Sequence, residues 1–268
     1  MTIELVRTLR NDLALVGGEE HGVRFAFTER TGGASLPPYE SLNLGTHVGD
    51  DPAHVAVNRR RVLVALDADD LGDSLLVPNQ VHGDAVELVD GRAACDLASV
   101  RDRIAAGCDA IVCTAPRVPV MLCFADCVPV VLTCPGGFAV IHSGWKGTYA
   151  RIAAKAARTL MKATGAAPEQ LSAYIGPHIL GDEYEVSSEL IGRFEAEFPS
   201  ARRMHEGRLL DLSACIIAAL GEAGVCAEHV VDPRLSTCKM NERFFSYRAE
   251  DGASGCGRHA AVAVMAGV

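Results

Sequence analysis

The sequence has little positive charge for its size. Among its 268 residues, 25 are Lys or Arg and 34 are Asp or Glu, so the formal net charge is -9 at pH 7. Nucleic acids and phospholipid surfaces are anionic, and proteins that bind them in general present a basic face to them. We therefore expect neither a general nucleic-acid binder nor a membrane-surface protein. A few arginines can still bind a small anion locally.

The sequence also has no segment suited to crossing a membrane or directing export. A membrane-spanning helix needs ~20 consecutive apolar residues, whereas the longest apolar stretch, 118–132, contains Asp126 and two prolines. The first residues, Met-Thr-Ile-Glu, have neither the basic start nor the apolar core of a signal peptide. A cytoplasmic location is the expectation that follows.

Ten cysteines are present, but no two of them have CxxC spacing. A redox dithiol and a cysteine-rich zinc knuckle are therefore not expected. A disulfide framework is typical of small secreted domains, and we expect most of these cysteines to be buried residues with free thiols. The chain likewise lacks a glycine-rich dinucleotide fingerprint or phosphate loop placed between a strand and a helix.

The apolar pattern predicts an α/β (α+β-like) fold. Short apolar runs separated by Pro or Gly, which are typical of strands buried on both faces, occur at 110–114, 118–124, 128–134 and 138–142. Other patterns predict strands at 23–28, 171–175, 228–231 and 260–265, and helices at 52–66, 152–161, 187–198 and 211–223. Strands and helices do not alternate regularly. We therefore expect one domain over residues 1–268, with a mixed central sheet and flanking helices.

Polar side chains stand at the ends of otherwise apolar strands in three segments, which contain His82, Cys127 and His142. Cys127 and His142 flank a predicted β-hairpin in which 128–134 pairs with 138–141, so these two residues should lie close together. Two imidazoles and one thiolate suit Zn2+, and three protein ligands leave the fourth tetrahedral position open, as in catalytic zinc sites.

Spacing alone leaves three interpretations of these residues open. They can bind a metal ion together. They can instead be hydrogen-bonded histidines at strand ends beside a buried thiol. In the third interpretation, Cys127 and His142 are a metal-free catalytic pair in which the imidazole keeps the cysteine as its thiolate.

The sequence resembles the YfiH/YlmD family, whose members were formerly labelled polyphenol oxidases or laccase-domain proteins. The resemblance extends from about residue 23 to 265 and depends on seven motifs that occur in order. They are Phe-Thr-Glu-Arg-Thr-Gly-Gly at 27–33, Ser-Leu-Asn-Leu-Gly at 41–45, Asn-Gln-Val-His at 79–82, Ala-Asp-Cys-Val-Pro-Val at 125–130, His-Ser-Gly-Trp-Lys-Gly at 142–147, Ile-Gly-Pro at 175–177 and Phe-Phe-Ser-Tyr-Arg at 244–248.

This resemblance implies a fold similar to that of certain cysteine-hydrolase toxins, and a metal site formed by His82, Cys127 and His142. The implied metal is Zn2+, which Cu2+ could replace because it binds more tightly to such ligands. The implied substrates are purine nucleosides and phosphate. Adenosine, inosine and methylthioadenosine would be phosphorolysed to the free base and a sugar 1-phosphate, and adenosine would also be deaminated. No obligatory protein partner is evident.

Five further side chains are candidates for substrate contacts or proton transfer. Arg59 and Arg248 can bind phosphate, because a guanidinium matches its charge and geometry, but each can equally form a surface salt bridge. Asn43 and Gln80 can hold a base edge or a ribose hydroxyl, or else cap backbone groups in their loops. Asp126 is a candidate catalytic residue, either as proton shuttle or as partner of a histidine ligand. Its side chain should point away from that of the next residue unless the backbone bends.

Other functions fit parts of the pattern. A multicopper oxidase is not expected, since such enzymes arrange copper ligands as His-x-His, and this sequence has nine histidines and no His-x-His. Copper at the zinc site could still give incidental oxidase activity. A thiol hydrolase or deamidase using Cys127 and His142 is an alternative, as is a peptidoglycan-precursor editing enzyme. A protein that binds metal or nucleoside without turnover is the remaining alternative.

Overall fold

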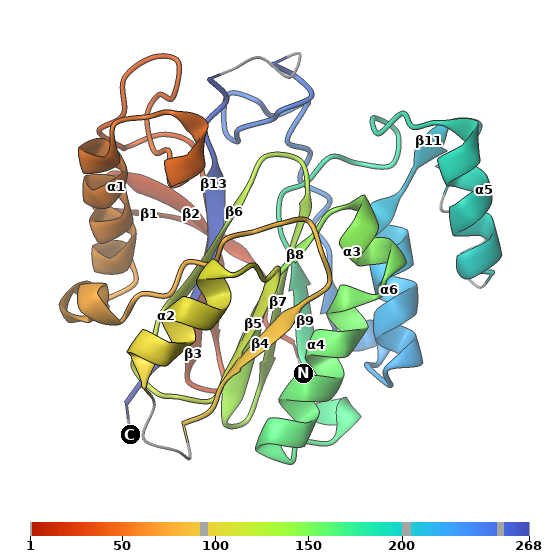
Figure 1. Cartoon of the computed structure of the whole chain (residues 1–268), viewed down its shortest axis with the longest axis horizontal. Helices are drawn as coiled ribbons and strands as arrows, with labels where there is room; N and C mark the ends of the chain where they lie inside the picture. Colours follow the sequence, from red (N-terminus) through yellow and green to blue (C-terminus); the bar gives the residue numbers. More distant parts are fainter. Residues whose placement is uncertain (1, 92–95, 200–204, 251–254, 268) are drawn as a thin grey trace.

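Two β-sheets lie face to face in the centre of the molecule, and helices cover their outer faces (Figure 1). The computed structural model describes residues 2–91, 96–199, 205–250 and 255–267. Within these ranges, no helix has the length and apolar character needed to cross a membrane.

The first sheet is antiparallel and has five strands. In spatial order these are β1 (Val6–Arg10), β2 (Leu13–Glu20), β3 (Val23–Thr28), β13 (His259–Met265) and β6 (Val120–Phe124). Strand β13 comes from the far end of the sequence and pairs antiparallel with both β3 and β6. The two ends of the described chain therefore meet in this sheet.

The second sheet is mixed and has six strands, which confirms the predicted mixed sheet. Its strands are β12 (Val230–Val231), β9 (Ser172–Ile175), β7 (Val128–Cys134), β8 (Gly137–Ser143), β5 (Ala110–Cys113) and β4 (Val86–Val89). The outer pairs, β12 with β9 and β4 with β5, are parallel, whereas the central strands are antiparallel. The predicted hairpin is present as β7 and β8.

Apolar residues fill three layers. Between the sheets, rings such as Phe25, Phe124 and Tyr174 pack against aliphatic residues of both sheets. The outer face of the six-stranded sheet is covered by α3 (Trp145–Tyr149), α4 (Ile152–Thr164), α5 (Ser188–Glu197) and α6 (Leu212–Glu222). The outer face of the five-stranded sheet is covered by α1 (Pro52–Ala65). Because the central strands of the six-stranded sheet are buried on both faces, their sequences are continuous apolar runs.

Several elements differ from the prediction. In the expected strand at 228–231, the first two residues belong to a 3-10 helix and only the last two pair as β12. The predicted loop that ends at residue 258 includes residues 251–254, which lie outside the described residues. The structure adds elements that the apolar pattern did not predict. These are strands β1, β2 and β4, helices α2 (Leu97–Ala105) and α3, 3-10 helices η1 (Thr46–Val48), η2 (Asp69–Ser74), η3 (Pro168–Gln170) and η4 (Ala227–His229), and the two-stranded ribbon of β10 (His205–Glu206) and β11 (Leu209–Leu210).

A buried carboxylate, Glu29, fastens the loop before β13 to the five-stranded sheet. Its side chain is 2% exposed and accepts hydrogen bonds from Arg7 at 2.7 and 2.9 Å and from Arg243 at 2.9 and 2.5 Å. Burial raises the pKa of Glu29, but the two guanidinium groups outweigh burial and lower it below its ordinary value. Arg243 belongs to the same loop as Arg248, so this ion pair also helps to place Arg248.

We expect Glu29→Gln to lower the free energy of unfolding at pH 7 by about 2 kcal/mol, because it weakens hydrogen bonds to charged groups. A carboxylate whose folded-state pKa is lowered stabilises the fold above its unfolded pKa of about 4.3, and this contribution is lost as pH falls toward the folded value. The difference between wild type and variant should therefore shrink near pH 4. Urea unfolding at both pH values measures it, with the exposed Glu228→Gln as control. An equal difference at both pH values would contradict an ionised Glu29.

A candidate metal centre and its cavity

His82, Cys127 and His142 come together where segments of the two sheets meet. Cys127 lies between β6 of one sheet and β7 of the other, and His142 lies in β8, one residue before its end. His82 lies in the loop that precedes β4. One ligand atom from each of the three side chains lies within 4.8 Å of the others. Among the residues that the structure describes, this is the one such group of three found.

The β7–β8 hairpin accounts for the approach of Cys127 and His142. His142 pairs with Pro129 in the hairpin register, which places it beside the residues that lead into β7. The ring of His82 then meets the ring of His142 edge-on, with their centroids 4.8 Å apart. The sequence predicted that Cys127 and His142 lie close together. The fold confirms this and places His82 beside them.

A carboxylate that the sequence analysis did not single out holds two of the three ligands. Asp109 is fully buried, and its Oδ1 lies 2.8 Å from Nδ1 of His142. The same carboxylate accepts the backbone N–H groups of Val81 at 3.3 Å, His82 at 3.0 Å and Gly83 at 2.7 Å. It thereby stabilises His82 in a left-handed conformation with φ of 57°. Nε2 of His142 is left as the nitrogen that can bind a metal.

The electrostatics of the group favour the metal-binding form of the cysteine. Burial raises the pKa of the Cys127 thiol, but the imidazoles of His142 and His82 outweigh burial and bring this pKa to about 6. Burial lowers the pKa of His142, but the Cys127 thiolate and Asp109 outweigh it and raise this pKa to about 9. Both shifts favour a thiolate beside an imidazolium over a neutral thiol beside a neutral imidazole. The thiolate is the form that binds metals, and a bound cation takes the place of the imidazolium proton.

The donor set fits zinc and also suits copper, since imidazole and thiolate bind both metals. The contact between His142 and Asp109 is the histidine–carboxylate arrangement that orients imidazole ligands in metal sites. Gly144 leaves space beside the ligands, because a Cβ atom at this position would lie 3.1 Å from Sγ of Cys127 and 3.3 Å from Cδ2 of His82. A side chain there would crowd the three ligands.

The three ligands line a cavity of about 490 Å³, a volume within the range of small-molecule sites. Aromatic and cationic side chains share its wall, among them Phe124, Trp145, Tyr184, Tyr247, His47, Arg248 and Arg258. A larger cavity of about 670 Å³ lies between α1 and α2 and contains none of the three ligands. The chemistry of the side chains therefore favours the smaller cavity as the functional site.

Part of this cavity is electropositive. The guanidinium of Arg248 donates to the carbonyls of Glu183 and Glu185 at 3.4 and 3.3 Å, and that of Arg258 donates to backbone carbonyls as well. Neither arginine has a carboxylate partner in the described part of the chain. Burial lowers the pKa of His47, and the positive charge of Arg258 lowers it further. An anion would be stabilised in this part of the cavity.

Asp126 lies on the cavity wall, but its oxygens are engaged. Oδ1 accepts the hydroxyls of Thr237 at 2.7 Å and Ser246 at 2.6 Å, and Oδ2 accepts the backbone N–H of Arg248 at 2.6 Å. Asp126 has a φ of 89°, so the backbone does bend at this point. These contacts fasten the loop that carries Arg248. A role for Asp126 in proton transfer stays a prediction.

The structure divides the other candidate residues between the two cavities and the loops. Gln80 and Arg248 line the cavity with the metal ligands, although the Gln80 amide also exchanges two hydrogen bonds of 2.8 Å with the Cys123 backbone. Asn43 is fully buried and bonds loop groups, and it is not among the cavity-lining residues. Arg59 donates to the Leu44 carbonyl and lines the larger cavity. Neither Asn43 nor Arg59 is among the residues that line the cavity with the metal ligands, and contact of either with a substrate stays a prediction.

Comparison with known proteins gives consistent similarities over nearly the whole chain. A family model described as multi-copper polyphenol oxidoreductase laccase matches residues 24–266. A purine nucleoside phosphorylase of Deinococcus radiodurans is 37% identical over 250 residues, which cover 91% of this chain and 90% of that protein. The crystal structure of a hypothetical protein YfiH from Bacillus licheniformis has a TM-score of 0.80 at 28% identity, covering 96% of this chain and 97% of that one. YlmD from Geobacillus stearothermophilus has a TM-score of 0.79 at 28% identity, with coverage of 98% and 99%.

We expect Asp109→Asn to weaken Zn2+ binding by roughly 10- to 100-fold, the usual effect of removing a partner of a metal-bound histidine. The amide would no longer offer two acceptor oxygens to the His82 loop and to His142. Competition with a chromogenic chelator measures the affinity, and circular dichroism shows whether the variant is folded. The exposed Asp102→Asn on α2 is the matched control. Unchanged zinc affinity in a folded Asp109→Asn protein would contradict the positioning role of this carboxylate.

Proposed function

The chain belongs to the YfiH family, the family whose model is described as a laccase, and on that premise we propose that it is a zinc-dependent purine nucleoside phosphorylase. Its substrates in this proposal are adenosine, inosine and methylthioadenosine. Each is cleaved with inorganic phosphate to the free purine base and a sugar 1-phosphate. The same site also deaminates adenosine.

The observation that carries the proposal is the combination of groups around one cavity. His82, Cys127 and His142 offer a metal site, aromatic rings offer flat surfaces for a purine, and arginines without carboxylate partners among the described residues offer sites for phosphate. The name purine nucleoside phosphorylase, which the relative in Deinococcus radiodurans carries, supports this interpretation.

In phosphorolysis, the bond between the anomeric carbon and the base nitrogen breaks, and its electron pair leaves with the base. A phosphate oxygen supplies the electron pair of the new bond to the anomeric carbon. The sugar carries positive charge in the transition state, so catalysis depends on the placement of charges around it. When bound by His82, Cys127 and His142, a divalent cation supplies Lewis acidity that stabilises negative charge developing on a substrate.

The chain's own residues would then bind and orient the substrates. In this proposal the rings of Trp145 and Tyr184, which line the cavity, pack against the purine. Arg248, which also lines it, supplies positive charge on a loop fastened by Asp126. In deamination a proton must move to the leaving amine, and Asp126, which lines the cavity, is the candidate carboxylate for this transfer.

A thiol hydrolase is the second candidate function, and one observation favours it. His142 and His82 bring the pKa of Cys127 to about 6 against the effect of burial, which favours a thiolate beside an imidazolium. Such a pair can act as nucleophile and general acid. A copper oxidase is less well supported, because the described residues offer one group of three ligands, whereas a multicopper enzyme needs a mononuclear copper site and a trinuclear cluster.

Chromatography of inosine and adenosine, incubated with and without phosphate, separates these functions. We expect zinc-loaded wild type to release hypoxanthine and adenine only with phosphate, and to form inosine from adenosine without it. Cys127→Ala should lose more than about 100-fold in rate, since even the loss of an outer partner of a ligand costs 10- to 100-fold. Cys226→Ala, which lies outside the cavity lining, is the matched control.

Other outcomes of this experiment would contradict the proposal or favour another function. Absence of turnover of either nucleoside by zinc-loaded protein would contradict it. Base release that needs no phosphate would indicate a hydrolase. Hydrolytic activity that persists in chelator-treated protein and is abolished by alkylation of Cys127 would favour the thiol hydrolase.

A further inference from the structure

Two cavity-lining side chains that come from distant parts of the sequence, His47 and Arg258, lie side by side. They pack over the same backbone position, Gly45. A Cβ atom at Gly45 would lie 2.8 Å from Cγ of Arg258 and 3.4 Å from Cε1 of His47. A residue with a side chain at this position would push the guanidinium and the imidazole apart, so glycine here permits their close approach.

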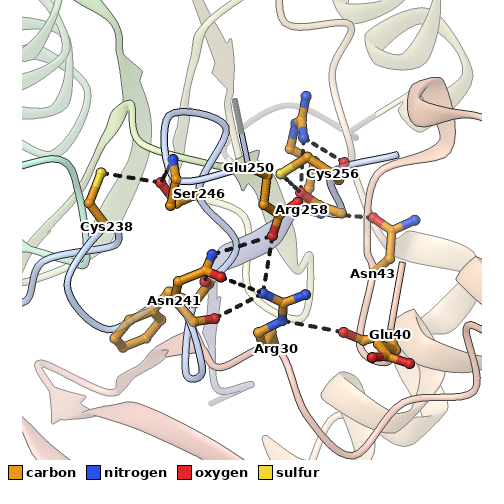
Figure 2. Close-up of polar contacts among 12 residues, drawn as sticks. Arg30, Glu40, Asn43, Cys238, Asn241, Ser246, Glu250, Cys256 and Arg258 are labelled. Atoms are coloured by element: carbon orange, nitrogen blue, oxygen red, sulfur yellow. Dashed lines mark hydrogen bonds and ion pairs between the residues drawn. The ribbon is translucent and has the colours of Figure 1, made fainter. Parts of the chain in front are cut away.

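Asn43 hydrogen-bonds the backbone of both segments that carry His47 and Arg258. Its side-chain oxygen accepts the backbone N–H groups of Gly45 at 3.1 Å and of Arg258 at 2.9 Å. Its amide nitrogen donates to the Gly45 carbonyl at 3.1 Å and to Asp50 at 2.8 Å. Figure 2 shows Asn43 directed toward the backbone of Arg258, at the edge of the loop that also carries Glu250. The two segments are therefore held in one arrangement before any ligand binds.

The guanidinium of Arg258 is anchored through one nitrogen. Nη1 donates to the carbonyls of Cys256 at 2.7 Å and Gly257 at 2.9 Å (Figure 2). Within the described ranges, Nε and Nη2 have no hydrogen-bond acceptor and the group has no carboxylate partner. Arg258 is half-buried and lines the cavity. An anchored guanidinium with free N–H groups matches two oxygens of a phosphate, which a lysine cannot do in the same way.

Arg59, which the sequence suggested as an anion contact, has a different role in the same region. Its Nε and Nη2 both donate to the carbonyl of Leu44, at 3.1 and 2.8 Å. It thus supports the segment that leads into Gly45 and His47 from the side of the larger cavity. Arg59 thus supports the backbone next to Gly45, whereas the side chains of Arg258 and His47 line the cavity.

We propose that Arg258 and His47 form the binding subsite for the inorganic phosphate cosubstrate. The guanidinium takes two phosphate oxygens and the imidazole of His47 contacts a third. Arg258 thereby holds the dianion whose oxygen forms the new bond to the anomeric carbon as the base departs with its electron pair. This assignment rests on the phosphorylase function proposed above and names the residues that supply its second substrate.

The kinetic test compares Arg258→Met with wild type in zinc-loaded protein. The KM for phosphate should rise roughly 10- to 100-fold, the range expected for loss of hydrogen bonds to a charged group. The KM for inosine should change less than about twofold, and adenosine deamination, which uses no phosphate, should persist. Arg258→Lys should recover only part of the phosphate affinity. Arg60→Met, an exposed arginine on α1, is the matched control for loss of one positive charge.

Isothermal titration with inorganic phosphate gives a readout that does not depend on turnover. Wild type should bind phosphate, and Arg258→Met should bind it at least about tenfold more weakly at equal zinc content. His47→Ala, which changes an exposed side chain, serves as the second variant if Arg258→Met does not fold, and it should weaken phosphate binding several-fold.

The outcomes separate this subsite from the phosphorylase function itself. If wild type binds phosphate through Arg258 but cleaves no nucleoside, the phosphorylase proposal fails and the subsite remains. If wild type cleaves nucleosides and the KM for phosphate is unchanged in Arg258→Met, or rises equally with the KM for inosine, the subsite assignment is overturned. Absence of phosphate binding to wild type overturns it as well.

Discussion

The buried carboxylate of Asp109 is the group on which the arrangement of the metal ligands depends. Burying a charge is costly unless it is paired and hydrogen-bonded. Here the carboxylate is satisfied by Nδ1 of His142 and by three successive backbone N–H groups around His82. Two ligands from different parts of the sequence are thus fixed by a single anion. The third ligand, Cys127, needs no such group because the β7–β8 hairpin places it directly.

The opposite wall of the cavity depends on the loop between β12 and β13. Two carboxylates that lie just after strands β6 and β3 fasten this loop, Asp126 through Thr237 and Ser246, and Glu29 through Arg243. Arg30, which follows β3, also donates to the Asn241 carbonyl and to Glu250 of this loop (Figure 2). Cys127 and His142 therefore lie at strand ends and His82 in the loop before β4, whereas Arg248 and Arg258 belong to the loop between β12 and β13. The fold thus brings the candidate metal ligands and these two arginines to the wall of one cavity.

Several helices and one hairpin that depend on local sequence were predicted, whereas the long-range strand pairings were not. The β7–β8 hairpin and helices α1, α5 and α6 follow from apolar periodicity and turn residues over short stretches. Strand β1 is exposed along its length, so it has no apolar pattern to reveal it. The antiparallel sheet forms because β13 returns between β3 and β6, and no local pattern reports such a return.

Contacts between residues far apart in the sequence also limited what could be predicted of the site. Asp109 stands directly before the apolar run of β5, and an acidic residue at the start of a buried strand was the available signal for it. Its partner, His142, becomes apparent only when β5 and β8 are paired. Arg258 and His47 are more than two hundred residues apart in the sequence, so only the fold brings them together over Gly45. Arg59 and Asn43 were chosen from chemistry alone, and in the fold both support the loop beside the cavity.

Titration of the protein with Co2+, a spectroscopic substitute for Zn2+, tests most directly whether His82, Cys127 and His142 form a metal site at the substrate cavity. One Co2+ per chain should bind and give both a thiolate-to-metal charge-transfer absorption and the intense visible bands of tetrahedral coordination. The visible bands should change on addition of inosine, and the charge-transfer band should vanish in Cys127→Ser. A spectrum without a thiolate band, or one that neither inosine nor the Cys127 substitution alters, would contradict a catalytic metal site at these residues.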